Sequence, residues 1–132
     1  MKRILSVLGL LFLIMIMNCK NSENTNMQLV TPEEMESIIE MEGVQLIDVR
    51  TPEEFAEGFI KGAQNIDFYS DTFDQDILKL DKTKPVVLYC KSGGRSANCA
   101  EKLIEAGFVK VYDLDGGITQ WQHSGFKLIS LE

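Results

Sequence analysis

Short apolar runs alternate along the chain with segments in which apolar residues recur at helical spacing. Continuous apolar runs of about four to eight residues are typical of buried parallel strands. The runs predict strands at 28–30, 44–48, 63–67, 85–89 and 109–114, with a terminal edge strand at 127–130. The intervening segments predict helices at 31–41, 51–57, 71–79, 96–106 and 116–123. This alternation favours an α/β fold, with a mostly parallel central sheet of about five strands flanked by helices on both faces.

Two of the predicted helices begin with the same signal. Thr31 and Thr51 are each followed by a proline and then by a glutamate in the first turn, Glu34 or Glu54. In a capping box, the threonine side chain and the glutamate side chain each accept a hydrogen bond from a backbone N–H, and proline suits the first helical position. Both helix starts are therefore well defined by the sequence.

The N-terminal segment has the features of an export signal. Lys2 and Arg3 precede an apolar stretch that is short for a membrane span, and Cys19 follows it. The end of this stretch resembles the lipobox of bacterial lipoproteins, although Asn18 stands where that motif usually has a small residue. We therefore expect a signal peptide at 1–18, lipid attachment at Cys19, a flexible polar tether over 19–26 and a folded domain at 27–132.

This organisation predicts an exported lipoprotein of a bacterial cell envelope, on the periplasmic or surface side, that meets the membrane through its N-terminal lipid. The alternative is an unprocessed membrane anchor in which Cys19 has no role.

Composition and charge narrow the range of partners. Removing Lys2 and Arg3 from the 13 basic residues leaves 11 against 20 acidic residues. Because this charge repels a phosphate backbone, we expect no nucleic-acid partner. The single histidine and the three cysteines are scattered, so no metal site is predicted, and we expect no cofactor. We expect the domain to be monomeric.

The segment 86–96 carries the candidate chemistry. An apolar run leads directly to Cys90, and two glycines and two cations follow before the next predicted helix. A helix start presents unpaired N–H groups and partial positive charge, and glycines let such groups turn inward around an anion. The pKa of a cysteine falls in such surroundings, so Cys90 should be a thiolate near neutral pH. The predicted anion-binding loop consists of Lys91, Ser92, Gly93, Gly94, Arg95 and Ser96. The alternative is a buried structural cysteine before an ordinary turn.

Asp48 and Arg50 stand at the end of another predicted strand. Ligand sites in open parallel sheets lie beyond the carboxyl ends of the strands. We therefore expect both residues at the same edge of the sheet as Cys90.

Four segments, at 46–55, 62–66, 89–96 and 114–121, resemble the signature segments of single-domain rhodanese sulfurtransferases and occur in the same order. The resemblance extends from about residue 27 to the end of the chain. It implies the rhodanese-like α/β fold and a sulfur relay. One position differs from the family pattern, because Phe59 stands where the family usually has histidine.

The resemblance also implies roles for individual residues. Cys90 would be the nucleophile that carries a persulfide, taking sulfane sulfur from a donor such as thiosulfate and passing it to an acceptor such as cyanide or a thiol. The backbone N–H groups of 91–96 would hold the anionic persulfide, and Lys91 and Arg95 would attract the donor anion. Asp48 and Arg50 would form a supporting shell that braces the loop, or alternatively an ordinary surface ion pair.

Three alternative functions fit the sequence less well. A phosphatase or arsenate reductase would also use a cysteine loop closed by arginine, but Cys90 and Arg95 stand one residue closer than in loops of that type. A non-catalytic rhodanese-like module could bind a partner or sense redox state at the envelope. A thiol–disulfide oxidoreductase would need a Cys-x-x-Cys pair, which the chain lacks.

The remaining candidate side chains are expected to be structural. Cys99, Ile118 and Trp121 should pack in the core, and His123 should lie at the surface near the end of the last helix.

Overall fold

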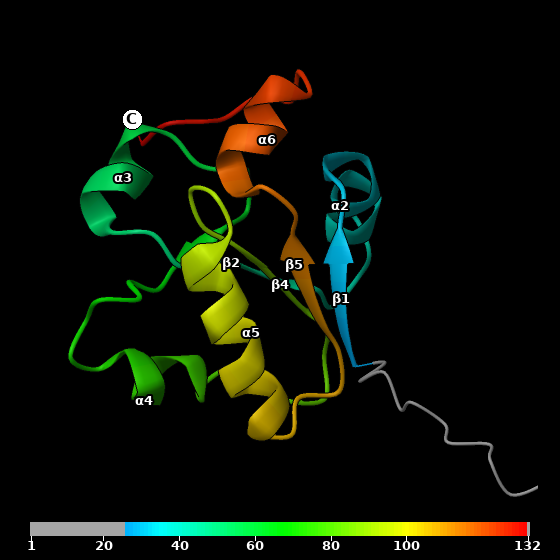
Figure 1. The fold of residues 1–132 in the computed structure, drawn as a ribbon, viewed down its shortest axis with the longest axis vertical. Coiled ribbons are helices and arrows are strands. Elements are labelled where there is room, and N and C mark those ends of the chain that lie inside the picture. The colour runs from blue at the N-terminus through cyan, green and yellow to red at the C-terminus, as the bar shows by residue number, and fades with distance from the viewer. Residues whose placement is uncertain (1–25, 132) are drawn as a thin grey trace, which may run out of the picture.

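The computed structural model describes residues 26–131 as a five-stranded sheet with helices packed on it (Figure 1). The predicted signal peptide at 1–18 and lipid-attachment residue Cys19 lie outside the described residues. Within 26–131, no helix is long and apolar enough to cross a membrane. In chain order the elements are β1 (Met27–Val30), α2 (Pro32–Ile39), β2 (Gln45–Asp48), α3 (Pro52–Glu57), β3 (Gln64–Asn65), α4 (Phe73–Ile77), β4 (Val86–Tyr89), α5 (Gly94–Glu105), β5 (Val111–Leu114) and α6 (Gly117–His123).

The sheet has the strand order β1-β5-β4-β2-β3, and every pairing between these strands is parallel. The central strand β4 pairs with β2 on one side and β5 on the other. Asp48, the last residue of β2, is level with Tyr89, the last residue of β4. The predicted α/β fold is confirmed, and Asp48, Arg50 and Cys90 lie at one edge of the sheet as expected.

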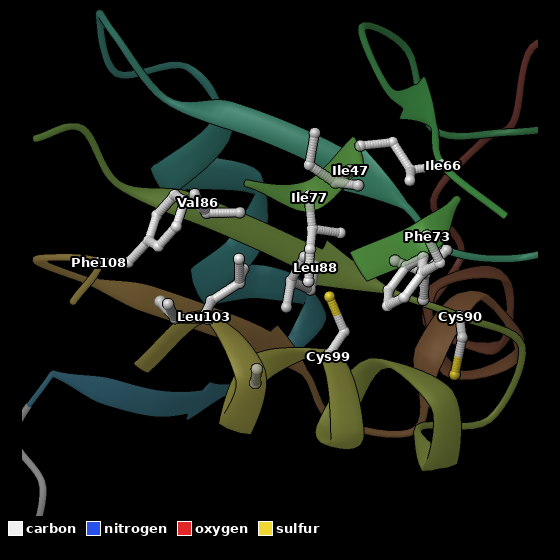
Figure 2. Packing of buried hydrophobic residues seen from close by; sticks show 13 residues of the cluster. Ile47, Ile66, Phe73, Ile77, Val86, Leu88, Cys90, Cys99, Leu103 and Phe108 are labelled. Carbon is white, nitrogen blue, oxygen red and sulfur yellow. The ribbon is translucent and has the colours of Figure 1, made fainter. Parts of the chain in front are cut away.

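Side chains of β4 alternate between two cores. Val86 and Leu88 face the core under α4 and α5, whereas Val87 and Tyr89 face the core under α2 and α6. Figure 2 shows the first of these cores, with Leu103 and Cys99 of α5 directed at the sheet. Because both faces of a parallel sheet are covered, its strands read as continuous apolar runs. Helices on both faces are thus also confirmed.

Several predicted elements are shorter in the structure. The strand at 63–67 shrinks to β3, because the Asp67 carboxylate accepts a hydrogen bond from the Tyr69 backbone N–H (2.9 Å) and starts a turn. The helix at 71–79 shrinks to α4. Conversely, α5 begins at Gly94, two residues before the expected start.

The predicted terminal edge strand at 127–130 is wrong. Ile129 forms only an isolated antiparallel bridge with Phe59, through two backbone hydrogen bonds of 2.9 Å. Phe59 also stacks on Phe55, with 4.1 Å between the ring centroids. The C-terminal segment therefore pairs with the connection after α3 instead of extending the sheet, and the residue that departs from the family pattern packs against α3.

Both predicted capping boxes are present. The Glu34 carboxylate accepts from the Thr31 N–H (2.8 Å), and the Glu54 carboxylate accepts from the Thr51 N–H (2.9 Å). Each threonine hydroxyl in turn accepts from the glutamate N–H at 3.2 Å. Because the Glu54 carboxylate completes the capping box at the start of α3, it is held in a fixed position beside the candidate site.

Candidate active site

Cys90 directly follows the buried strand β4, and the loop after it turns sharply into α5. Gly93 has φ of 117°, in the region that favours glycine, and its N–H donates to the Cys90 Sγ at 3.1 Å. Only 1% of Cys90 is exposed. Figure 2 shows it at one end of the core layer, near the first turn of α5. The loop thus encloses the sulfur and directs backbone donors at it.

The pKa of the Cys90 thiol is set by two opposing effects. Burial would raise it, but hydrogen bonds from the Ser96 side chain and from the backbone N–H groups of Ser96, Gly93 and Ser92 outweigh burial. The pKa is therefore lowered from its ordinary value. This separates Cys90 from an inert buried cysteine, whose pKa would be raised.

The start of α6 orients the loop after Cys90 through two backbone hydrogen bonds. The Ile118 N–H donates to the Cys90 carbonyl (2.9 Å), and the Thr119 N–H donates to the Lys91 carbonyl (3.1 Å). In a trans peptide the C=O and N–H point in opposite directions, so these bonds turn the N–H groups of Lys91 and Ser92 away from α6. Two N–H groups of one short helix thus orient the first two peptide planes of the loop.

This contact requires glycine at the first position of α6. Gly117 has φ of 61°, and a Cβ there would come within 2.6 Å of the Cys90 and Lys91 carbonyl oxygens. The close approach of the two backbones leaves no room for a side chain.

Arg95 is held by an ion pair within the domain. Its two terminal nitrogens donate to the Glu54 carboxylate at 2.7 and 2.9 Å, and its guanidinium lies 5.5 Å from the Tyr69 ring centroid. The hydrogen bond from Arg95 is the main reason that the pKa of Glu54 is lowered to about 2. The Arg95 charge is therefore compensated. Lys91 is exposed and forms no ion pair with any residue of the described range 26–131.

Asp48 and Arg50 form a buried ion pair, so the surface ion pair considered above is wrong. The Arg50 guanidinium donates to the Asp48 carboxylate at 2.7 Å and to the Gly58 carbonyl at 2.7 Å, and neither side chain is more than 7% exposed. The Arg50 guanidinium also lies 5.8 Å from the ring centroid of Tyr89, the residue before Cys90. The Tyr89 hydroxyl accepts from the Ile60 N–H at 3.1 Å. The pair therefore supports the end of β4 and does not contact the loop donors.

Asp113 is a residue near the site that the sequence interpretation missed. It lies in β5, is 2% exposed, and turns to the same face as Cys90 because Val111, two residues earlier, packs in that core. Within residues 26–131, its Oδ1 has no hydrogen-bond partner. Burial raises the pKa of Asp113 to about 6. The only signal in the sequence was an acidic residue near the end of a predicted strand.

The residues expected to be structural are found where predicted. Cys99, Ile118 and Trp121 are buried, and His123 is exposed at the end of α6. Burial raises the pKa of the Cys99 thiol to about 12, and Cys90 and Cys99 are both free thiols. Among residues 26–131, no three histidine, cysteine, aspartate or glutamate side chains gather in a way that could hold a metal ion.

Comparison with known proteins identifies the family. A model of the rhodanese-like domain matches residues 31–124, which is most of the chain. The chain belongs to the rhodanese-like domain family. The chain is 37% identical over 95 residues to thiosulfate sulfurtransferase GlpE of Pseudomonas aeruginosa, a match that covers 72% of this chain and 84% of that protein. It is 33% identical over 95 residues to a sulfurtransferase of Allochromatium vinosum, covering 72% and 87% of the two chains.

Solved structures agree with this assignment. A rhodanese-like domain protein from Staphylococcus aureus superposes with a TM-score of 0.65 and 30% identity, covering 80% of this chain and 99% of that one. A rhodanese-related protein from Thermoplasma volcanium gives a TM-score of 0.69 at 25% identity, covering 77% and 97%. The match therefore covers nearly the whole length of the two solved structures and more than three quarters of this chain.

The contact between α6 and the loop makes Gly117 a sensitive position. Gly117→Ala combines a left-handed backbone with a clash, whereas Gly125→Ala shares only the backbone cost, because Gly125 has φ of 90° and nothing within 4 Å of a Cβ. We expect Gly125→Ala to lower the free energy of unfolding by about 1–2 kcal/mol and Gly117→Ala by about 1–3 kcal/mol more. Urea unfolding measures both. Equal losses would contradict the role assigned to this contact.

The buried Asp113 should make stability depend on pH. Its pKa is raised on folding, so the native state keeps a proton that the unfolded chain releases, and stability falls as the pH rises through about 6. Asp113→Asn removes this loss. Between about pH 4 and pH 7.5, the free energy of unfolding of the variant should gain up to about 3 kcal/mol relative to the parent protein.

Asp115→Asn is the matched control for this experiment, because it removes a charge from an exposed residue two positions away. Unfolding curves at the two pH values should show little change for this control. A pH-independent difference between Asp113→Asn and the parent would show that Asp113 is not protonated on folding.

Proposed function

We propose that this protein is a rhodanese-type sulfurtransferase that moves sulfane sulfur through a persulfide on Cys90. One observation carries the proposal: the Cys90 sulfur is enclosed by N–H and hydroxyl donors that lower its pKa despite burial. Such donors stabilise an anionic sulfur, and both the thiolate and the persulfide are anions. The thiosulfate sulfurtransferase relatives support the assignment.

The reaction has two displacement steps. In the first, the Cys90 thiolate attacks the outer sulfur of thiosulfate, a sulfur–sulfur bond forms on Cys90, and the sulfur–sulfur bond of thiosulfate breaks with release of sulfite. In the second, a nucleophile such as cyanide attacks the outer sulfur of the persulfide and leaves as thiocyanate. The Cys90 thiolate is then restored, and no external oxidant or reductant is consumed.

The charges of the site suit an anionic donor. The protein as a whole is acidic and repels anions, so local positive charge has to offset this repulsion. Lys91 forms no ion pair within residues 26–131, and it is the residue that we assign to attracting the donor. Arg95 is paired with Glu54 and primarily fixes the start of α5. We therefore assign the attraction of the donor anion, which the sequence suggested for both cations, to Lys91 alone.

The loop does not support a phosphatase. Cys90 and Arg95 are one residue closer than in phosphatase-type loops, and the Arg95 guanidinium is engaged by Glu54 instead of being directed at a tetrahedral anion. The shorter loop suits a single sulfur atom better than it suits a tetrahedral anion. The remaining alternative is a non-catalytic module that binds a partner or senses redox state, and the experiment below separates it from the enzyme.

Export and lipid attachment at Cys19 remain part of the proposal. The positive residues Lys2 and Arg3, the apolar stretch and the following cysteine support an envelope lipoprotein. In that location the enzyme would handle sulfur compounds outside the cytoplasm, such as thiosulfate, cyanide or thiols.

The proposal predicts a mass change at one cysteine. Purified protein that is first reduced and then incubated with thiosulfate should gain one sulfur atom, and cyanide should remove it as thiocyanate. Cys90→Ser should gain none, because the nucleophile is gone. Cys99→Ala is the matched control and should behave like the parent protein, because Cys99 is buried and its pKa is raised. Intact mass spectrometry measures each step.

Two results would contradict the enzyme. A folded parent protein that takes no sulfur from thiosulfate or from a small-molecule persulfide would favour the binding module. Sulfur gain that persists in Cys90→Ser would place the chemistry on another residue.

A further inference from the structure

Tyr69 is an exposed aromatic residue at the edge of the sheet that carries Cys90. Of the large hydrophobic side chains exposed within residues 26–131, it is the most exposed, at 67%, and the only aromatic one. Single exposed hydrophobic residues are common and need no function of their own. The position of Tyr69 relative to the reactive loop is therefore the feature to explain.

Backbone hydrogen bonds place Tyr69 next to the end of β4. The Val49 N–H donates to the carbonyl of Tyr89, the residue before Cys90, at 3.0 Å. The Phe68 N–H donates in turn to the Val49 carbonyl at 3.2 Å. The segments that follow β2, β3 and β4 thus lie side by side, and Tyr69 belongs to the reactive edge.

The turn that carries Tyr69 is held on both sides of this residue. The Asp67 carboxylate accepts from the Tyr69 N–H at 2.9 Å, and the Asp67 carbonyl accepts from the Ser70 N–H at 3.0 Å. The preceding residue, Phe68, packs against Phe73 with 5.0 Å between the ring centroids. The backbone at Tyr69 is therefore fixed, and the exposed ring projects from a defined position.

Arg95 connects this ring with the cysteine loop. Its guanidinium lies over the Tyr69 ring, 5.5 Å from the centroid, and its two terminal nitrogens donate to Glu54. A cation is attracted to the face of an aromatic ring, so this contact holds the ring beside the start of α5. Hydrogen bonds to Glu54 are the main reason that the pKa of Arg95 is raised, and Cys90 and Tyr69 raise it further. One face of the ring is thus occupied, and the rest is open next to the site.

The open part of the ring suits an organic group. Thiosulfate and cyanide are small ions without an apolar surface to bury, whereas a thiol can carry an apolar or aromatic group. Aromatic groups pack on one another in offset-stacked or edge-to-face arrangements. The partner that fits this ring is therefore a thiol with an aromatic group.

We propose that Tyr69 is a specificity-determining residue that binds the aromatic group of a thiol acceptor. The inference rests on the proposed sulfur transfer. The acceptor thiolate attacks the outer sulfur of the Cys90 persulfide, a sulfur–sulfur bond forms on the acceptor, and the sulfur–sulfur bond on Cys90 breaks. The electron pair of that bond stays on the Cys90 thiolate, so the acceptor becomes a persulfide without an external oxidant or reductant.

The test compares ethanethiol with 2-phenylethanethiol, two thiols of similar acidity that differ by one phenyl ring. Transfer of sulfur from excess thiosulfate to each thiol is measured with full-length protein over a range of thiol concentrations. The parent protein should prefer 2-phenylethanethiol in kcat/KM by about three- to tenfold, because its ring packs on Tyr69. The difference should lie mainly in KM, because this contact is made before and during the reaction alike.

Tyr69→Ala removes the ring and should abolish this preference, whereas Tyr69→Phe should keep it, because the ring and not the hydroxyl makes the contact. The ratio between the two thiols is the readout, since a general disturbance of the loop slows both thiols equally. Leu29→Ala is the matched control. It also shortens an exposed hydrophobic side chain, but in β1, at the other edge of the sheet, and it should keep the preference of the parent.

A binding measurement does not depend on sulfur transfer. 2-Phenylethanol is a non-reacting analogue of the aromatic thiol, and ethanol is the matched analogue without the ring. Protein labelled with carbon-13 in the tyrosine rings gives NMR signals from only three residues, and Tyr69→Phe assigns the one of interest. 2-Phenylethanol should shift the Tyr69 signal more than those of Tyr89 and Tyr112, and ethanol at the same concentration should not.

The outcomes separate this inference from the proposed function. An unchanged preference in Tyr69→Ala, an equal loss of rate with both thiols, or no preference in the parent would overturn the specificity role in a working sulfurtransferase. A selective shift of the Tyr69 signal in a protein that takes up no sulfur would support the binding surface and reject the enzyme. Because Tyr69 is exposed, neither substitution removes a side chain from the core.

Discussion

The site depends on two hydrogen bonds between backbone groups, from the N–H groups of Ile118 and Thr119 to the carbonyls of Cys90 and Lys91. They fix the orientation of the peptide planes that follow the cysteine. Without them, the loop could satisfy its carbonyls elsewhere, and the N–H groups would no longer converge on the sulfur. The need for glycine at 117 follows from the same close approach, since any side chain would separate the two backbones. The environment of the sulfur is therefore built mainly from main-chain geometry, and charged side chains adjust it.

The buried charges near this edge of the sheet follow two different rules. Asp48 and Arg50 neutralise each other, and Arg50 also donates to the Gly58 carbonyl. These contacts offset the free energy lost when the two charges are removed from water. Among residues 26–131, Asp113 has no counterion, and one of its carboxyl oxygens has no hydrogen-bond partner. The ion pair of Asp48 and Arg50 holds a guanidinium next to the Tyr89 ring at the end of β4. The burial of Asp113 leaves a group whose charge can change near neutral pH, and it lies on the same face of the sheet as the reactive sulfur.

Local signals explain how much of the structure could be predicted. The apolar runs located the strands, the threonine–proline–glutamate pattern located the starts of α2 and α3, and the residues around Cys90 pointed to an anion-binding loop. The contacts of Arg95 with Glu54 and of Ile118 with Cys90 join residues distant in the chain, and no local pattern encodes them. The segment at 127–130 failed for the same reason: its alternation suits a strand, but its partner is Phe59 and not a sheet edge. Asp113 was missed because its burial at the reactive edge of the sheet depends on how the strands and helices pack, which no local pattern encodes.

Glu54 has two tasks at once. One carboxylate closes the capping box that starts α3 and receives both terminal nitrogens of Arg95 from the first turn of α5. Opening of the first turn of α3 would therefore release Arg95, and movement of Arg95 would remove support from that turn. The two segments should behave as one cooperative unit in local unfolding. The rigidity of the cysteine loop is consequently shared with a short surface helix that contributes no donor to the sulfur.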